Sequence, residues 1–143
     1  MKRVIERPGM LGVFVDILGR SSDPGLVLQA AWCLTNLCSG DEEDTRAIVA
    51  AGALPVLVQN LTHPQEEVRE QIIWNLSNIA GENEKYRDMV LEMNVIPLLL
   101  KNFSSDNVPL LRTVAWTISN LCRGRPRPQW EFVSCSISYI CKG

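Results

Sequence analysis

The stretch VREQIIWNLSNIA at residues 68–80 decides the fold, because two other stretches of the chain match it position by position. They are LVLQAAWCLTNLC at residues 26–38 and LLRTVAWTISNLC at residues 110–122. Their tryptophans, Trp32, Trp74 and Trp116, recur every 42 residues. A chain that repeats at a constant interval of this length is built from stacked copies of one unit.

Each copy is predicted to hold three helices. Gly52 and Asn94 mark a sharp corner between the first and second helices, since Gly and Asn are the residues that tolerate positive φ. Pro55 and Pro97 suit the first turn of the second helix, where a backbone N–H has no partner within the helix. The predicted ranges are 42–51 and 84–92 for first helices, 54–61 and 96–103 for second helices, and 66–80 for the third.

A period of about 40–47 residues with helical patterning is typical of armadillo and HEAT arrays. We therefore predict an all-α, right-handed superhelical armadillo solenoid. It is a single domain over residues 1–143, divided into a partial repeat (1–40), two repeats (41–81 and 82–124) and a truncated repeat (125–143).

A stripe of apolar residues follows each third helix at spacings of three and four residues, which is typical of a core-facing helix. In the middle copy it holds Ile72, Leu76 and Ile79. One copy alone buries too little, so its neighbours must supply the other wall. The matching residues in the outer copies are Ala30, Leu34 and Leu37, and Val114, Ile118 and Leu121.

A second strip, displaced from the apolar stripe, holds Gln71, Trp74 and Asn78 on one helix face. Stacked third helices lie about 10 Å apart, which is close to three residues of extended chain. An asparagine amide can pair with both groups of a peptide backbone, and a row of indoles can hold Lys and Arg stems with a cation–π attraction of ~0.5–2 kcal/mol each. The outer copies carry Gln29, Trp32 and Asn36, and Thr113, Trp116 and Asn120.

This strip predicts a ladder that binds an extended basic peptide. A single Trp on an amphipathic helix is usually a core residue, but an Asn in a helix interior is disfavoured without a role. Three Trp–Asn pairs in register favour binding. Acidic residues at 41–44, Glu82 and Glu84 would select positive charge, although acids at 41–44 also favour a helix N-terminus.

Composition excludes several other classes. The net charge of −2 gives no reason to expect nucleic-acid binding, and no apolar stretch reaches the length of a membrane helix. We expect a soluble, intracellular chain without cofactor or metal, its five cysteines being small buried thiols. Three Asn-x-Ser/Thr sequons, at Asn60, Asn75 and Asn102, are interpreted as chance matches.

The three Trp-x-x-x-Asn stretches resemble those of importin-alpha, the adaptor that carries cargo with nuclear localisation signals. The resemblance implies that Trp32, Trp74 and Trp116 sandwich basic side chains and that Asn36, Asn78 and Asn120 hold the peptide backbone. It also implies a lysine-selective pocket made by Gly40, Thr45 and Glu82, with Gln71 contacting the signal. The family usually has Asp at the position of Glu82.

The resemblance further implies where the chain acts and what it binds. The expected partners are cargo proteins with Lys/Arg-rich signals, and the expected location is the cytoplasm and nucleus. Importin-beta would bind only through a basic segment that we expect this chain to lack. Apolar residues at the two ends predict self-association.

Two other functions were weighed. A generic armadillo scaffold of the catenin-like kind should favour acidic guests through Lys and Arg, whereas the carboxylates near the Trp–Asn pairs favour a basic guest. An enzyme with Cys33 or Cys38 as nucleophile lacks a base, because His63 lies in a remote turn. We predict that the protein is not an enzyme.

Overall fold

The computed structural model describes residues 8–38 and 42–123, and this part of the chain is helical without any strand. The prediction of an all-α fold is confirmed. The helices are α2 (Pro8–Arg20), α3 (Pro24–Cys38), α4 (Glu42–Ala50), α5 (Ala53–Gln59), α6 (Glu66–Glu82), α7 (Glu84–Glu92), α8 (Val95–Leu100) and α9 (Val108–Cys122), with 3-10 turns η1 (Asn60–Thr62) and η2 (Lys101–Ser104).

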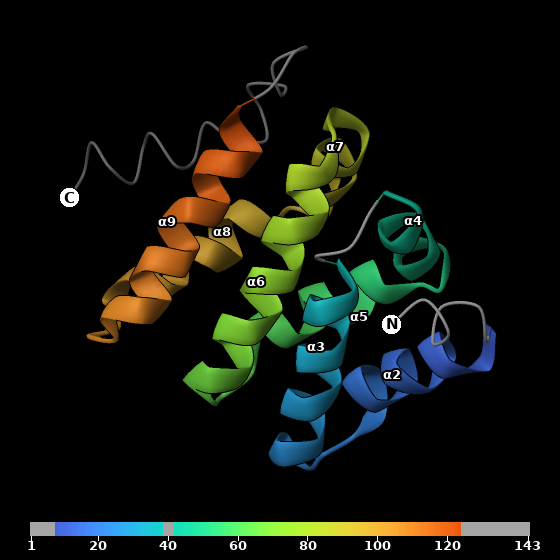
Figure 1. Cartoon of the computed structure of the whole chain (residues 1–143). Coiled ribbons are helices and arrows are strands. Elements are labelled where there is room, and N and C mark those ends of the chain that lie inside the picture. The colour runs from blue at the N-terminus through green and yellow to red at the C-terminus, as the bar shows by residue number, and fades with distance from the viewer. Residues whose placement is uncertain (1–7, 39–41, 124–143) are drawn as a thin grey trace.

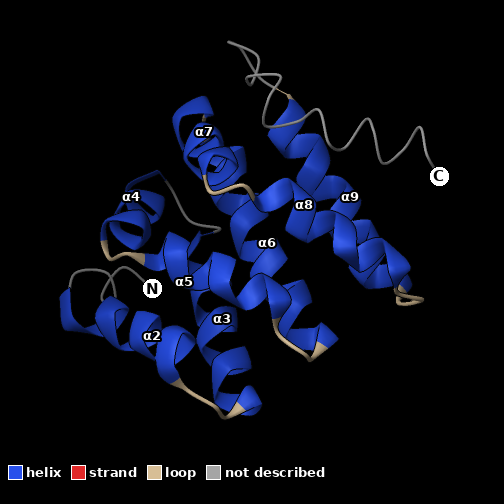
Figure 2. Ribbon diagram, turned by 180° about the vertical axis from the view of Figure 1, so that it is seen from behind, coloured by secondary structure: helices blue, strands red, loops and turns tan. Residues whose placement is uncertain are grey.

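The three long third helices, α3, α6 and α9, lie side by side in one row (Figure 1). Helix α6 packs against α3 on one side and α9 on the other. The shorter helices lie behind the row, where α5 contacts α6 and α8 contacts α9. Figure 2 shows this side of the molecule. The repeats therefore stack as the 42-residue period predicts.

Both predicted corners adopt the left-handed backbone conformation. Gly52 has φ 86° and Asn94 has φ 58°, and each directly precedes a second helix. The second helices are shorter than predicted, because each tightens into a 3-10 turn, η1 or η2. The stretch GMLGV at residues 9–13 corresponds to GALPV at residues 52–56, with one extra residue between the two copies, but Gly9 lies inside α2 and forms no corner.

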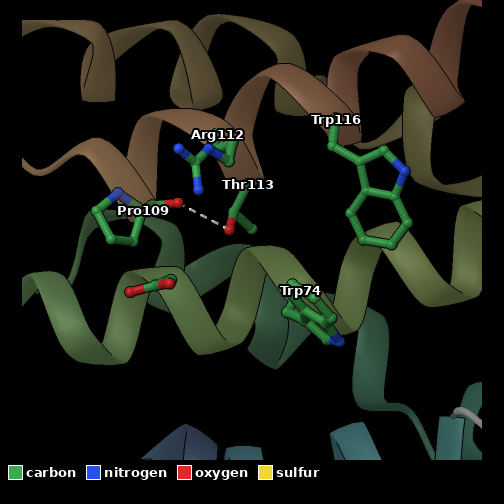
Figure 3. Close-up of a pocket in the computed structure, with 6 residues that line it drawn as sticks. Trp74, Pro109, Arg112, Thr113 and Trp116 are labelled. Carbon is green, nitrogen blue, oxygen red and sulfur yellow. Dashed lines mark hydrogen bonds between the residues drawn. The ribbon is translucent and has the colours of Figure 1, made fainter.

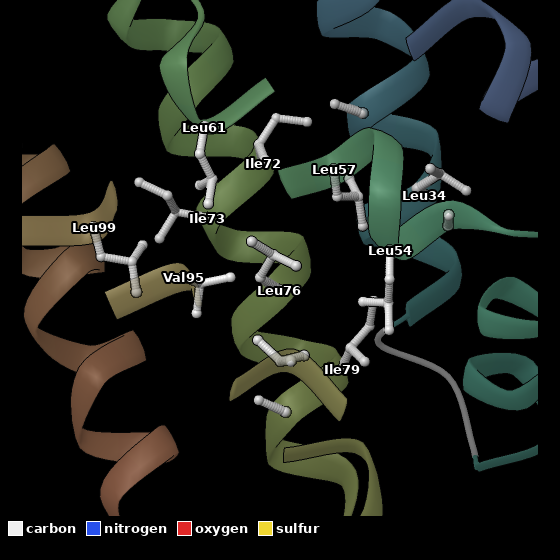
Figure 4. Close-up of a cluster of buried hydrophobic side chains, with 14 of the residues drawn as sticks. Leu34, Leu54, Leu57, Leu61, Ile72, Ile73, Leu76, Ile79, Val95 and Leu99 are labelled. Atoms are coloured by element: carbon white, nitrogen blue, oxygen red, sulfur yellow. The ribbon is translucent and has the colours of Figure 1, made fainter. Parts of the chain in front are cut away.

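The core lies between the row of third helices and the helices behind it (Figure 4). The predicted residues Ile72, Leu76 and Ile79 of α6 are all 0% exposed. Of the stripes in the outer copies, Ile118 is only partly buried. Among the described helices, α3 and α6 are each followed by a first helix that packs against them, α4 and α7 respectively, whereas no described helix follows α9.

The three sequon asparagines are buried parts of the repeat interfaces. Asn75 is 0% exposed, and its Nδ2 donates to the Ala31 carbonyl of α3 at 2.9 Å. Asn60 Nδ2 donates across to the Leu18 carbonyl at 2.8 Å. Asn102 accepts from Arg69 Nε at 2.9 Å. These amides join neighbouring copies, and this packing role accounts for an asparagine at each of the three positions.

The structure bears on the expected burial of the cysteines and on the expected absence of a membrane-spanning helix. Cys33 and Cys122 are exposed, so the prediction of buried thiols is wrong for both. None of the described helices is long and apolar enough to cross a membrane.

Candidate peptide-binding groove

The three tryptophans lie on the three parallel third helices and are exposed to solvent. Trp32 on α3 is 55% exposed, Trp74 on α6 is 40% exposed and Trp116 on α9 is 42% exposed. Large apolar side chains are normally buried, so an exposed row of three indoles is an unusual feature of this face. We call this surface the Trp strip.

Trp74 and Trp116 contact each other across the boundary between α6 and α9. Their ring centroids are 5.2 Å apart and their planes are tilted by 50° (Figure 3). Beside them lies an open cavity of about 360 Å³. Its other lining residues are Glu70 of α6 and Pro109, Arg112 and Thr113 of α9.

The three predicted asparagines differ in accessibility. Asn36 is exposed, Asn78 is half-buried and Asn120 is 4% exposed. Asn120 Nδ2 donates to Ser77 Oγ at 3.0 Å, which fixes its amide against α6. Its Oδ1 is buried without a hydrogen-bond partner. A bound N–H could reach this acceptor only if the side chain turned outward, because the oxygen atom is itself buried.

Asn78 lacks the contact that its copy Asn120 makes. Thr35 has the repeat position of Ser77, but its hydroxyl accepts from Gln71 Nε2 at 2.6 Å. Asn78 Nδ2 is buried without a partner. In α9 the position of Gln71 is occupied by Thr113, whose shorter side chain donates within its own helix to the Pro109 carbonyl (Figure 3). The longer Gln71 amide therefore explains why the two copies differ.

The structure does not place the three residues of the predicted lysine pocket in one described cavity. Gly40 lies outside the described residues. Thr45 of α4 is 0% exposed. Glu82, at the end of α6, is half-buried and lines a polar cavity of about 180 Å³. That cavity also contains Asn120, Arg87 and Arg123 and does not include Thr45.

Arg87, which sequence reasoning did not single out, is 2% exposed. Its Nε and Nη2 donate to Asp88 Oδ1 at 3.0 and 2.8 Å, and its Nη1 donates to the Arg123 carbonyl at 2.9 Å. It thus ties the start of α7 to the end of α9. Because Thr45 is the matching residue one repeat earlier, a hydroxyl position of the predicted lysine pocket becomes a buried cation in the next copy.

Glu70 and Arg112 were also missed, although the repeat offered a signal. Both lie four residues before a tryptophan, one helical turn away on the same face. Within residues 8–38 and 42–123, no group of three or more His, Cys, Asp or Glu side chains is placed to hold a metal ion. The chemistry on this surface consists of aromatic faces, amides and single charges.

A row of third helices stacked on shorter ones, with an exposed indole at the same place in each, defines a repeat protein with a recognition surface. The chain belongs to the armadillo family: the Armadillo/beta-catenin-like repeat matches residues 2–39, 41–81 and 83–123.

Among curated proteins the chain is similar to importin-alpha subunits. It is 43% identical over 65 residues to importin subunit alpha-4 of Arabidopsis thaliana and 42% identical over 65 residues to importin subunit alpha-1b of Oryza sativa subsp. japonica. In both cases the match covers 46% of this chain and 12% of the relative.

Among solved structures the chain is similar to a designed armadillo repeat protein in complex with the peptide (KR)4. The TM-score is 0.83 at 26% identity, over 96% of this chain and 55% of the other. An engineered protein gives a TM-score of 0.84 at 28% identity, over the same shares.

Proposed function

We propose that this chain is an adaptor segment that binds an extended Lys/Arg-rich peptide, of the nuclear-localisation-signal kind, along the Trp strip. The observation that carries the proposal is the row of exposed tryptophans on α3, α6 and α9. The similarity to importin-alpha subunits and to an armadillo protein that holds (KR)4 supports it. The role is binding, and no residue is assigned to catalysis.

In this proposal the indoles of Trp32, Trp74 and Trp116 hold the stems of basic side chains. A stem between two ring faces needs about 3.5–4.0 Å on each side, or roughly 7–8 Å between the rings. The rings of Trp74 and Trp116 are closer than this, at 5.2 Å between centroids, so they must separate. Losing their contact costs ~0.5–1.5 kcal/mol, and one cation–π contact of ~0.5–2 kcal/mol can offset it.

The amides fix the peptide backbone. Asn36, Asn78 and Asn120 share one position in the repeat, and a buried amide atom of each of the last two lacks a partner. Binding that satisfied these atoms would recover part of the roughly 1–3 kcal/mol that an unpaired buried polar group costs. Glu82 would add a negative charge beside Asn120, and Gln71 would reach the guest only after leaving Thr35.

Titration with a short lysine-rich signal peptide tests the proposal. Trp74→Ala and Asn78→Ala should each weaken binding by ~1–3 kcal/mol, the range of interface anchors. Thr62→Ala is the matched control, because Thr62 is exposed and lies in η1. Equal affinity for a control peptide with Glu in place of Lys would instead support a generic armadillo scaffold without selectivity for basic signals.

The cellular role follows from the same proposal. A chain that binds such signals would meet cargo proteins in the cytoplasm and nucleus. Importin-beta is not assigned to any residue described here.

A further inference from the structure

The charge beside the Trp strip changes sign between α6 and α9. Four residues before each tryptophan, α3 has Leu28, α6 has Glu70 and α9 has Arg112. The position one turn before the tryptophan is therefore acidic in α6 and basic in α9.

These charges are available to a guest. Glu70 and Arg112 line the same cavity of about 360 Å³, beside Trp74 and Trp116. The ion pairs found among the described residues include none between Glu70 and Arg112. Arg112 is exposed, and Glu70 is half-buried. A guest lying across this boundary therefore meets one free carboxylate and then one free guanidinium group.

A uniformly basic guest does not match this surface. Its lysines would be attracted by Glu70 on α6 but repelled by Arg112 on α9, because like charges at close range are unfavourable. Adjacent helices are about 8–10 Å apart, which an extended chain crosses in about three residues. A carboxylate at that distance from the basic residue could pair with a guanidinium in bidentate geometry.

We propose, on the basis of the function proposed above, that the Trp strip prefers a peptide that carries both basic and acidic residues. Its basic residues lie over α3 and α6, and an acidic residue about three positions further along lies over α9, opposite Arg112. Glu70 and Arg112 determine where along the peptide the sign changes. The peptide class is thus a basic signal flanked on one side by acidic residues.

Fluorescence titration of the full chain with labelled peptides tests this preference. The reference peptide is an oligolysine of roughly nine residues, three for each repeat. In further peptides the three residues at the N-terminal or the C-terminal end are Glu or, as matched neutral controls, Gln. In one of the two orientations, the Glu peptide should bind about two- to fivefold more tightly than its Gln counterpart, the effect expected of an exposed ion pair.

Variants connect the preference to its residue. Arg112→Gln should bring the ratio of Glu to Gln affinity close to one, and Arg112→Glu should invert it. Lys101→Gln removes one positive charge from the exposed Lys101 of η2, outside the Trp strip, and should leave the ratio unchanged. Circular dichroism of each variant checks that it retains its helices.

Two results would overturn the inference. If the ratio does not exceed one in either orientation, or if it is unchanged in Arg112→Gln, the charge of α9 does not select the guest. When oligolysine binding still depends on Trp74, such a result leaves the proposed function intact. If Trp74→Ala does not weaken oligolysine binding, the groove is not the binding surface and both proposals are wrong.

Discussion

Asn75 joins α6 to α3 directly beneath the Trp strip, and Asn75→Ala should therefore loosen the contact between two repeats. Its Nδ2 donates to the Ala31 carbonyl at 2.9 Å and to the Gln71 carbonyl at 3.1 Å, and the residue is 0% exposed. Two hydrogen bonds contribute about 0.5–1.5 kcal/mol each. A cavity the size of the lost amide adds roughly 0.5 kcal/mol. The expected loss of unfolding free energy is about 1.5–3.5 kcal/mol.

Urea unfolding followed by circular dichroism measures this loss, provided that the m-value is unchanged. Cys33 is the matched control, because it has the same repeat position in α3 and is exposed. Cys33→Ala should change the unfolding free energy by less than about 0.5 kcal/mol, as is usual at the surface. If Asn75→Ala costs no more than Cys33→Ala, the buried amide does not hold the repeats together and the reasoning is refuted.

Three further predictions concern pH, backbone and side-chain amides. Hydrogen bonds from Ser105 and Asn107 lower the pKa of Glu66 below its ordinary value of 4.5. The stability that this carboxylate contributes is therefore present above pH 4.5 and is lost as the pH falls through the lower pKa of the folded state. In acid titrations followed by circular dichroism, Glu66→Gln should abolish this part of the decline in stability. Gly52→Ala should cost about 1–2 kcal/mol in urea unfolding, because φ is 86° and no atom crowds the site, so that a neutral result would contradict the conformational argument. Gln71→Thr removes the hydrogen bond from Gln71 to the Thr35 hydroxyl, but the unpaired Asn78 amide can donate to that hydroxyl in its place. Because one such bond has a net value of about 1 kcal/mol, the urea midpoint should change little. A large fall in the midpoint would show that Asn78 does not replace Gln71.

Much of the fold could be predicted because it depends on features that each repeat states locally. The apolar spacing of Ile72, Leu76 and Ile79 defines a core face, and α7 has the predicted bounds, Glu84–Glu92. Gly52 and Asn94 have the backbone conformation that their residue types allow. Each of these features follows from the residues of one repeat, without knowledge of how the adjacent repeat packs against it.

The rest could not be predicted because it depends on the neighbouring copy. Asn75 and Arg87 have the sequence pattern of ordinary polar helix residues, yet both are almost fully buried. Asn75 donates to a carbonyl of α3, and Arg87 donates to the Arg123 carbonyl just after α9. The exposed fraction of Asn120 likewise depends on Ser77 of the preceding copy. Helical periodicity separates a core face from an opposite face, but it does not show that α6 is covered on both flanks.

The differences between copies carry the specificity that the common features cannot. Trp74 and Trp116 occupy equivalent positions on stacked helices, so they repeat the same indole along the groove and cannot by themselves distinguish one part of a guest from another. One helical turn before the tryptophan, α6 has Glu70 and α9 has Arg112, so the charge at this repeat position is opposite in the two copies. A repeat protein can therefore keep the spacing of its ladder through its invariant positions while it selects the order of charges in its guest through the few positions that vary. In this chain the selection is expected at the boundary between α6 and α9, where both charges line one cavity.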